Sequence, residues 1–305
     1  MSNDNHDDTF YSELGLHISP KCIHTPTGAI IHFAQGSILN FQGHCIVNAA
    51  NELGIGGGGV DGAINRASGP QLVKARMNLP MESPGVRIPA GEVRVTPAFG
   101  GELHCWRIIH AVSANYNQVN QEDGDNLVRN AYSNALSVAN RMECPRIAFS
   151  LLSAGIYRGN CTLEHVLSLA VETLVECATK GQIIYLVAFT EQEVEALRIV
   201  FQQQLIHLVV QAIRVRDKVY LQNHFFTDII QEMWKVPCQS LLWRSYERFM
   251  PAYGFTCCED LHKHVEENST QTCEFLGIRR TEYVHRKKNG TLVQSVNDQL
   301  DRLVF

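Results

Sequence analysis

Over its first 205 residues, the chain alternates between short apolar runs and longer amphipathic stretches. Runs of four to eight apolar residues are typical of buried strands, and apolar positions three or four apart are typical of helices. The predicted strands cover residues 29–34, 44–48, 92–97, 106–112, 146–152 and 182–189. The predicted helices cover residues 61–75, 126–141, 162–180 and 190–205, with a break at Gly69 and Pro70. This alternation predicts an α/β fold in which a sheet lies between helical layers.

The two ends of the chain lack this pattern. Because its 305 residues exceed the ~100–200 residues of a usual domain, we expect appendages around one large domain. Residues 1–20 are polar and acidic without periodicity, which predicts a flexible leader. Residues 21–205 then form the α/β domain. Residues 206–305 are rich in aromatic side chains, including Trp234 and Trp243, and predict a mostly helical C-terminal extension.

The most distinctive stretch joins the second predicted strand to the first predicted helix. Residues 46–70 read IVNAANELGIGGGGVDGAINRASGP, with four consecutive glycines at 56–59. Glycines let backbone amides approach a ligand closely, and the start of a helix favours an anion such as phosphate. The carboxamide of Asn51 suits sugar hydroxyls, and the carboxylate of Asp61 suits a hydroxyl or a water to be activated. These residues predict a site for a sugar phosphate.

Two other nucleotide-binding motifs do not fit this stretch. The chain contains no GxxxxGK[ST] loop. Residues 54–59 match a bare GxGxxG, but no acidic residue ends a second strand about 20 residues later, as a dinucleotide fingerprint requires. A glycine-rich turn taken alone is often structural, so the prediction depends on a second motif.

That second motif follows the strand predicted at residues 146–152. Residues 149–158 read FSLLSAGIYR, and Gly155 would let neighbouring amides face a diphosphate. Both glycine-bearing loops come directly after strands. Because open α/β sheets bind ligands at the carboxyl ends of their strands, we expect the two loops to meet at one cleft.

Together, VNAAN, GGGGVDGAI and SAGIY resemble the macrodomain family, and within it the MacroD-type ADP-ribosyl hydrolases, over residues 29–204. The resemblance implies a three-layer α/β/α macrodomain with a mixed central sheet and no cofactor. It implies a hydrolase that removes ADP-ribose from modified Asp or Glu side chains, or that deacetylates O-acetyl-ADP-ribose. Asn51 and Asp61 would be catalytic: Asn51 bonds the distal ribose, and Asp61 positions or deprotonates a water. The ADP-ribose-binding residues that it implies are Ser37, Ile38, Ala50, Asn51, Gly56, Gly57, Gly58, Gly59, Val60, Ser153, Ala154, Gly155, Ile156, Tyr157 and Phe189.

Three residues depart from the family pattern. Ser37 stands where the family usually has an aspartate that binds the adenine amine, so the charge-assisted bond is lost. Asn65 stands where MacroD-type sequences often have histidine, and Ala154 replaces a threonine. The position of the aromatic residue near the adenine could fall on Phe189 or, with a one-residue offset, on Ala188. An alternative function is therefore a non-catalytic reader of ADP-ribose or of ADP-ribosylated proteins.

Composition restricts the partners and the compartment. The net charge is −5 and no basic stripe is present, which argues against nucleic acid as the main partner. The N-terminus lacks the apolar run of a signal peptide, and the ten cysteines show no paired spacing, so we expect a reducing compartment, the cytoplasm or the nucleus. The apolar runs are shorter than the ~20 residues that cross a bilayer, so no membrane partner is expected.

The C-terminal extension contains a group of cysteines and histidines that could be considered as metal ligands. Cys257, Cys258, His262 and His264 lie close in sequence, but their spacing matches no zinc module. We therefore predict no metal site. A protein partner is the contact that we expect for this extension.

Overall fold

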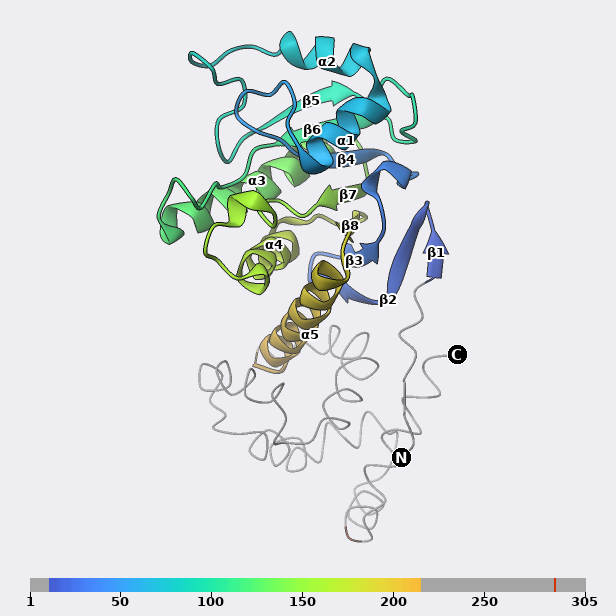
Figure 1. Cartoon of the computed structure of the whole chain (residues 1–305). Helices are drawn as coiled ribbons and strands as arrows, with labels where there is room; N and C mark the ends of the chain where they lie inside the picture. Colours follow the sequence, from blue (N-terminus) through green and yellow to red (C-terminus); the bar gives the residue numbers. More distant parts are fainter. Residues whose placement is uncertain (1–10, 215–287, 289–305) are drawn as a thin grey trace. The chain divides into compact units, whose positions relative to one another are not determined.

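The computed structural model describes residues 11–214 and residue 288. Its core is one eight-stranded sheet in the order β1-β2-β3-β8-β7-β4-β6-β5 (Figure 1). The five central strands run parallel, and β1, β2 and β5 pair antiparallel at the edges, so the sheet is mixed. The strands are β1 (Tyr11–Glu13), β2 (Leu16–His24), β3 (Ile30–Gln35), β4 (Cys45–Ala49), β5 (Val93–Pro97), β6 (Arg107–Ala111), β7 (Arg146–Ser150) and β8 (Ile183–Ala188).

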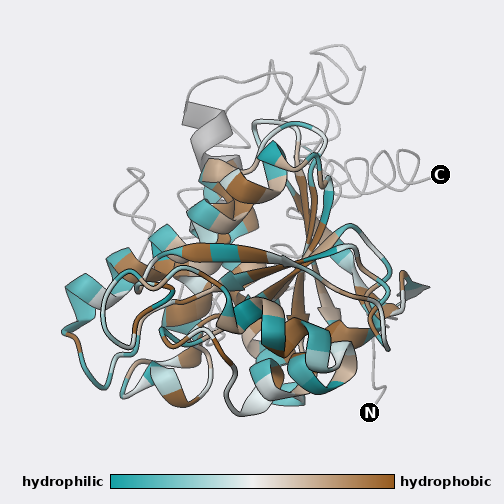
Figure 2. Cartoon of the chain, turned by 90° about the horizontal axis from the view of Figure 1, so that it is seen from above, coloured by the Kyte–Doolittle hydropathy of each residue, from teal (hydrophilic) through white to brown (hydrophobic). Residues whose placement is uncertain are grey.

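Helices cover both faces of this sheet (Figure 2). The helices are α1 (Gly59–Ser68), α2 (Pro70–Met77), α3 (Gln121–Arg141), α4 (Leu163–Cys177) and α5 (Glu191–Arg214), with short 3-10 turns η1 (Ile38–Asn40) and η2 (Ile156–Arg158). The predicted break at Gly69 is confirmed: Gly69 takes a φ of 80° and caps α2, and Pro70 is its first residue.

The register of the strands shows which helices share a face. Phe33 and Phe149 both pair with Leu186, so they point to the same side of the sheet. Tyr132 of α3 stacks on Phe149 with ring centres 5.3 Å apart, and Phe201 of α5 meets Phe33 edge-on at 4.9 Å. The opposite face packs in one cluster with the first two helices through side chains that include Ile46, Ile64, Leu72, Ala148 and Tyr185. The predicted three-layer α/β/α architecture is confirmed.

The predicted leader is wrong for residues 11–20. This segment forms β1 and most of β2, which are joined by a turn at Leu14 and Gly15 with φ of 50° and 77°. Leu16 and Ile18 alternate with exposed positions and are almost fully buried, so β2 contributes to the core. The predicted mostly helical extension over residues 206–305 lies outside the described residues, except for the end of α5 and residue 288.

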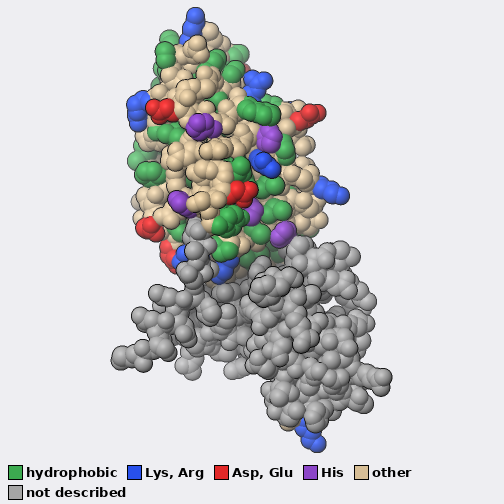
Figure 3. Space-filling view, turned by 90° about the vertical axis from the view of Figure 1, so that its right-hand side faces the viewer, with side chains coloured by type: hydrophobic (Ala, Val, Ile, Leu, Met, Phe, Trp, Pro, Cys, Tyr) green, Lys and Arg blue, Asp and Glu red, His purple; other side chains and the backbone are tan. Residues whose placement is uncertain are grey.

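The surface of the described part carries both signs of charge. On the coloured part of the face in Figure 3, basic and acidic side chains are scattered among neutral atoms, and neither sign gathers into one patch. None of the helices in the described ranges is long and apolar enough to span a bilayer.

We expect the protein to lose stability in mild acid because of His32 on β3. Its ring stacks on Tyr185 at 5.3 Å, and burial, with a smaller contribution from His24, lowers the pKa of His32 from 6.5 to about 4. The unfolded chain therefore binds a proton that the folded chain does not, and stability falls as the pH drops from about 6.5 towards 4. Between pH 7 and pH 5 we expect His32 to account for about 1–2 kcal/mol of this loss.

Urea unfolding at both pH values measures the effect. The variant His32→Phe keeps an aromatic ring against Tyr185 but cannot be protonated. Its stability should fall less than that of the wild type over the same interval. An equal fall in both proteins would show that His32 does not cause the acid sensitivity.

Candidate functional site

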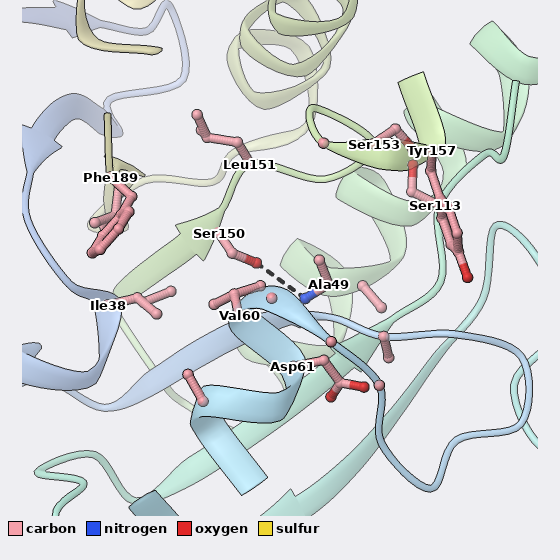
Figure 4. A pocket seen from close by; sticks show the side chains of 18 of the residues that line it. Ile38, Ala49, Val60, Asp61, Ser113, Ser150, Leu151, Ser153, Tyr157 and Phe189 are labelled. Carbon is pink, nitrogen blue, oxygen red and sulfur yellow. Dashed lines mark hydrogen bonds between the residues drawn. The ribbon is translucent and has the colours of Figure 1, made fainter. Parts of the chain in front are cut away.

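A cavity of about 630 Å³ lies at the carboxyl ends of the parallel strands. Its wall includes Ala49 at the end of β4, Ala111 at the end of β6 and Ser150 at the end of β7. Ile38 and Phe189 lie towards one end, and Ser113 and Tyr157 lie towards the other (Figure 4). Both glycine-bearing loops line it. The structure thus brings together two loops that are about 100 residues apart in sequence.

Most of the predicted site residues line this cavity. Gly56 and Ala154 do not: the carbonyl of Gly56 accepts a bond from Asn51, and Ala154 is buried behind its loop. Phe189, not Ala188, reaches the cavity, because Ala188 is fully buried at the end of β8 and Phe189 is 75% exposed. The predicted residues that line it are Ser37, Ile38, Ala50, Asn51, Gly57, Gly58, Gly59, Val60, Asp61, Ser153, Gly155, Ile156, Tyr157 and Phe189.

Asn51 shapes the first glycine loop. Its Nδ2 donates to the carbonyl of Gly56 at 3.0 Å, and its Oδ1 accepts from the amide of Gly54 at 3.1 Å. A Cβ placed on Gly57 would lie 3.1 Å from Asn51 Nδ2 and 3.4 Å from Asp61 Oδ2. The side chains of Asn51 and Asp61 therefore lie directly against Gly57, and a larger residue there would have to displace them.

Asp61 is held by a buried ion pair that the sequence analysis missed. Its Oδ1 accepts from Arg76 Nη1 at 2.5 Å and from Asn48 Nδ2 at 2.6 Å, and its Oδ2 accepts from Arg76 Nη2 at 3.3 Å. The Arg76 side chain is fully buried. The one signal in the sequence is its spacing, since Arg76 lies four residues after Leu72 and so on the same, buried side of α2.

Arg76 also bonds the glycine loop and a second residue of α1, the helix that carries Asp61. Its Nε donates to the carbonyl of Gly54 at 2.7 Å, and its Nη1 donates to Asn65 Oδ1 at 2.9 Å. Asn65 is thus a partner of Arg76. One guanidinium thus ties α2 to two residues of α1 and to the glycine loop.

His110 completes this buried network on the side of the sheet. Its Nδ1 lies 3.1 Å from Asn48 Nδ2, and its Nε2 lies 2.9 Å from Thr96 Oγ1. Burial, and then the charge of Arg76, lowers the pKa of His110 well below its usual value, so the ring is neutral. Because Asn48 Nδ2 donates to both Asp61 and His110, Nδ1 of His110 is the acceptor and Nε2 carries the proton.

The second loop is anchored to the segment that follows β6. Ser153 takes a φ of 57°, and its hydroxyl donates to the carbonyl of Ala114 at 2.7 Å. The amide of Tyr116 donates to the carbonyl of Tyr157 at 2.8 Å. A Cβ on Gly155 would meet no atom within 4 Å, so open space adjoins the loop at this glycine.

Three polar residues of the wall were not predicted. Ser150 Oγ is already bonded, to the carbonyl of Val47 and to the amide of Ala49 (Figure 4). Glu193 Oε2 accepts the amides of Phe189 and Thr190 at 2.8 and 2.9 Å. Ser113 is buried, and its hydroxyl has no hydrogen-bond partner within the described part of the chain. No sequence motif marks Ser113, because its place in the wall depends on the fold.

Among the described residues, no three His, Cys, Asp or Glu side chains are grouped so that they could hold an ion. Cys257, Cys258, His262 and His264 lie outside the described residues.

Comparisons with known proteins agree with this geometry. The family model for the Macro domain matches residues 47–168. A macro domain-containing protein of Xanthomonas axonopodis pv. citri is 44% identical over 123 residues, which are 40% of this chain and 67% of the relative. The O-acetyl-ADP-ribose deacetylase of Escherichia fergusonii is 34% identical over 165 residues, 53% of this chain and 89% of the relative.

The fold of this chain is also similar to that of a solved structure. The Oceanobacillus iheyensis macrodomain with ADP superimposes with a TM-score of 0.55 and 29% identity, covering 63% of this chain and 98% of that one. The family match includes the first glycine loop, Asp61 and the second loop. The chain belongs to the Macro domain family.

Proposed function

We propose that this protein binds ADP-ribose in the cavity and hydrolyses esters that join ADP-ribose to a carboxylate. The substrates would be ADP-ribosylated Asp or Glu side chains of proteins, or O-acetyl-ADP-ribose. The observation that carries this proposal is that two glycine-bearing loops, with Asn51 and Asp61 beside the first, line one cavity. Backbone amides and the N-terminus of α1 suit a diphosphate there.

The relatives support the same chemistry. One is named for the deacetylation of O-acetyl-ADP-ribose, and a similar solved macrodomain holds ADP. The exposed ring of Phe189 offers an apolar surface for a base or a ribose.

The hydrogen bonds already made at the site limit each residue's role. Asn51 uses one of its two N–H donors and one acceptor position within the loop, so one donor and one acceptor position remain for a ribose hydroxyl. From the described residues, Asp61 Oδ2 accepts only the 3.3 Å bond from Arg76, so it keeps a lone pair for a water. Proton uptake by Asp61 would leave the buried guanidinium of Arg76 without its counter-charge. We therefore assign Asp61 to orienting the water, with a ligand phosphate as the acceptor of its proton.

The second candidate is a reader that binds ADP-ribose without turnover. It is favoured by the two bonds from Arg76 to Asp61, which restrain this carboxylate, and by Asn65, whose carbonyl oxygen is bonded to Arg76. Ser37 offers no charge to an adenine amine, and this would weaken either function.

Two measurements on the full chain separate these candidates. Calorimetry tests binding of ADP-ribose, and release of labelled ADP-ribose from a protein modified on Asp or Glu, or of acetate from O-acetyl-ADP-ribose, tests hydrolysis. Binding with release supports the hydrolase, and binding without release supports the reader. No heat with ADP-ribose would refute both. If Asp61→Ala and the wild type release label equally, Asp61 has no catalytic role.

Ser113 is expected to bond directly to a ligand in the cavity. A buried hydroxyl without a partner is unfavourable, and a polar atom of the ligand would satisfy it. Ser113→Ala should lower the affinity for ADP-ribose about threefold to tenfold, which corresponds to about 1 kcal/mol, with no loss of stability. Ser150→Ala is the matched control: its hydroxyl is already bonded within the sheet, so it should lose stability more than affinity. Unchanged affinity in Ser113→Ala would contradict this role.

A further inference from the structure

The cavity proposed to bind a diphosphate has acidic side chains in its wall. Of the described residues that line it, Asp61 and Glu193 carry charge, and none is a lysine or arginine. The Asp61 carboxylate lies against Gly57, in the loop whose amides would face the anion. An uncompensated carboxylate in that position would repel a diphosphate.

Arg76 supplies the missing positive charge from behind the wall. It is fully buried, bonds both oxygens of Asp61, and does not itself line the cavity. We propose that Arg76 is the counter-charge that lets this cavity bind an anionic diphosphate although Asp61 lies beneath its glycine loop. This inference rests on the proposed function. Arg76 is thus a positioning and electrostatic residue that never touches the ligand.

In this proposal, the net charge of the pair formed by Asp61 and Arg76, and not the shape of the cavity, determines the affinity for a diphosphate. In the wild type the charges of Asp61 and Arg76 cancel. Arg76→Met leaves one buried negative charge, Asp61→Asn leaves one positive charge, and the double variant is again neutral. Affinity for ADP should therefore fall at least about tenfold in Arg76→Met, hold or rise in Asp61→Asn, and return to within about threefold of the wild type in the double variant.

A purely structural role for Arg76 predicts a different order. Loss of its bonds to Gly54 and Asn65 would disorder the loop in the single and the double variant alike. It therefore predicts that the double variant binds ADP no better than Arg76→Met, whereas charge compensation predicts recovery in the double variant. Adenosine lacks the phosphates, so its affinity should stay nearly constant across all variants if only the diphosphate region is affected.

Titration of ADP, ADP-ribose and adenosine by calorimetry or NMR tests the inference, with thermal unfolding to verify the fold. Lys74→Met is the matched control, because Lys74 is an exposed cation on the same helix α2, and it should leave all affinities unchanged. If Arg76→Met does not fold, Asp61→Asn and the double variant still decide. Asp61→Asn should bind ADP at least as tightly as the wild type, and selective weakening of ADP in this variant would overturn the inference.

The outcomes also separate this inference from the proposed function. A wild type that binds ADP but not ADP-ribose would refute the proposed function and leave the role of Arg76 standing. A wild type that binds both, with equal affinity for ADP in Arg76→Met, would overturn the role of Arg76 alone. A wild type that binds neither compound would refute both.

Discussion

Replacing Gly58 by valine is expected to lower the affinity for ADP-ribose about tenfold while the fold is retained. Gly58 lines the cavity, and a Cβ on it would meet no protein atom within 4 Å. Its φ of −87° and ψ of −172° suit any residue, so valine adds no backbone strain. Branched methyl groups there would occupy the space in which backbone amides approach the diphosphate. We expect Gly58→Val to keep about a tenth of the wild-type affinity, a loss of about 1.4 kcal/mol.

The neighbouring glycines would not give so clean a result. A side chain on Gly57 would meet Asn51 and Asp61, and Gly59 has a φ of 56° that strains other residues. Gly58→Ala is a graded control, with a smaller loss of affinity than Gly58→Val. Thermal unfolding of Gly58→Val should stay within about 4 °C of the wild type, since the poorer N-cap costs only about 1 kcal/mol. Unchanged ADP-ribose affinity in Gly58→Val would contradict this prediction and would show that the loop accommodates a side chain beside the ligand.

The central strands and most of the helices could be predicted from the sequence. Their signals are local, since a buried strand is a continuous apolar run and a helix repeats its apolar positions within a few residues. The start of α3 is an exception. The helix begins at Gln121, five residues before the predicted start at 126, because Asn120 caps it by accepting the amide of Asp123 at 2.9 Å.

The edge hairpin was missed for a different reason. Residues 11–24 lie in a short, mixed segment whose polar beginning dominates its composition. The alternation of Leu16 and Ile18 becomes meaningful once β3 offers a strand with which to pair. Pairing of edge strands depends on tertiary contacts, so the local pattern of apolar residues does not reveal it.

In the site, too, features with a local sequence signal were predictable and features that depend on tertiary contacts were not. The two glycine loops were predictable because each follows a strand within a few residues. The roles of Arg76 and Ser113 depend on which segments the fold brings beside them. For Arg76, the local pattern shows only a charged residue on the same helical face as a buried leucine, which usually indicates an aliphatic stem with its charge in water.

Breaking the ion pair between Arg76 and Asp61 is expected to have the largest effect on stability. Both side chains are almost completely buried, and Arg76 makes its hydrogen bonds to Asp61, Asn65 and Gly54 from inside the protein. Removing one partner of such a pair leaves an uncompensated buried charge, which typically costs about 3–5 kcal/mol. We expect Arg76→Met to lower the free energy of unfolding by about this amount in urea titrations at pH 7.

A double-mutant cycle isolates the charge contribution from the lost packing and hydrogen bonds. Asp61→Asn alone leaves the guanidinium unpaired and should also destabilise the fold. The double variant contains no buried charge at this position, so its loss should be smaller than the sum of the single losses by at least about 1 kcal/mol. Arg76→Lys keeps the charge but not the fork of donors, and it should be intermediate. Strictly additive losses would mean that the two side chains stabilise the fold independently, in which case the cancellation of charge behind the glycine loop would have no energetic basis.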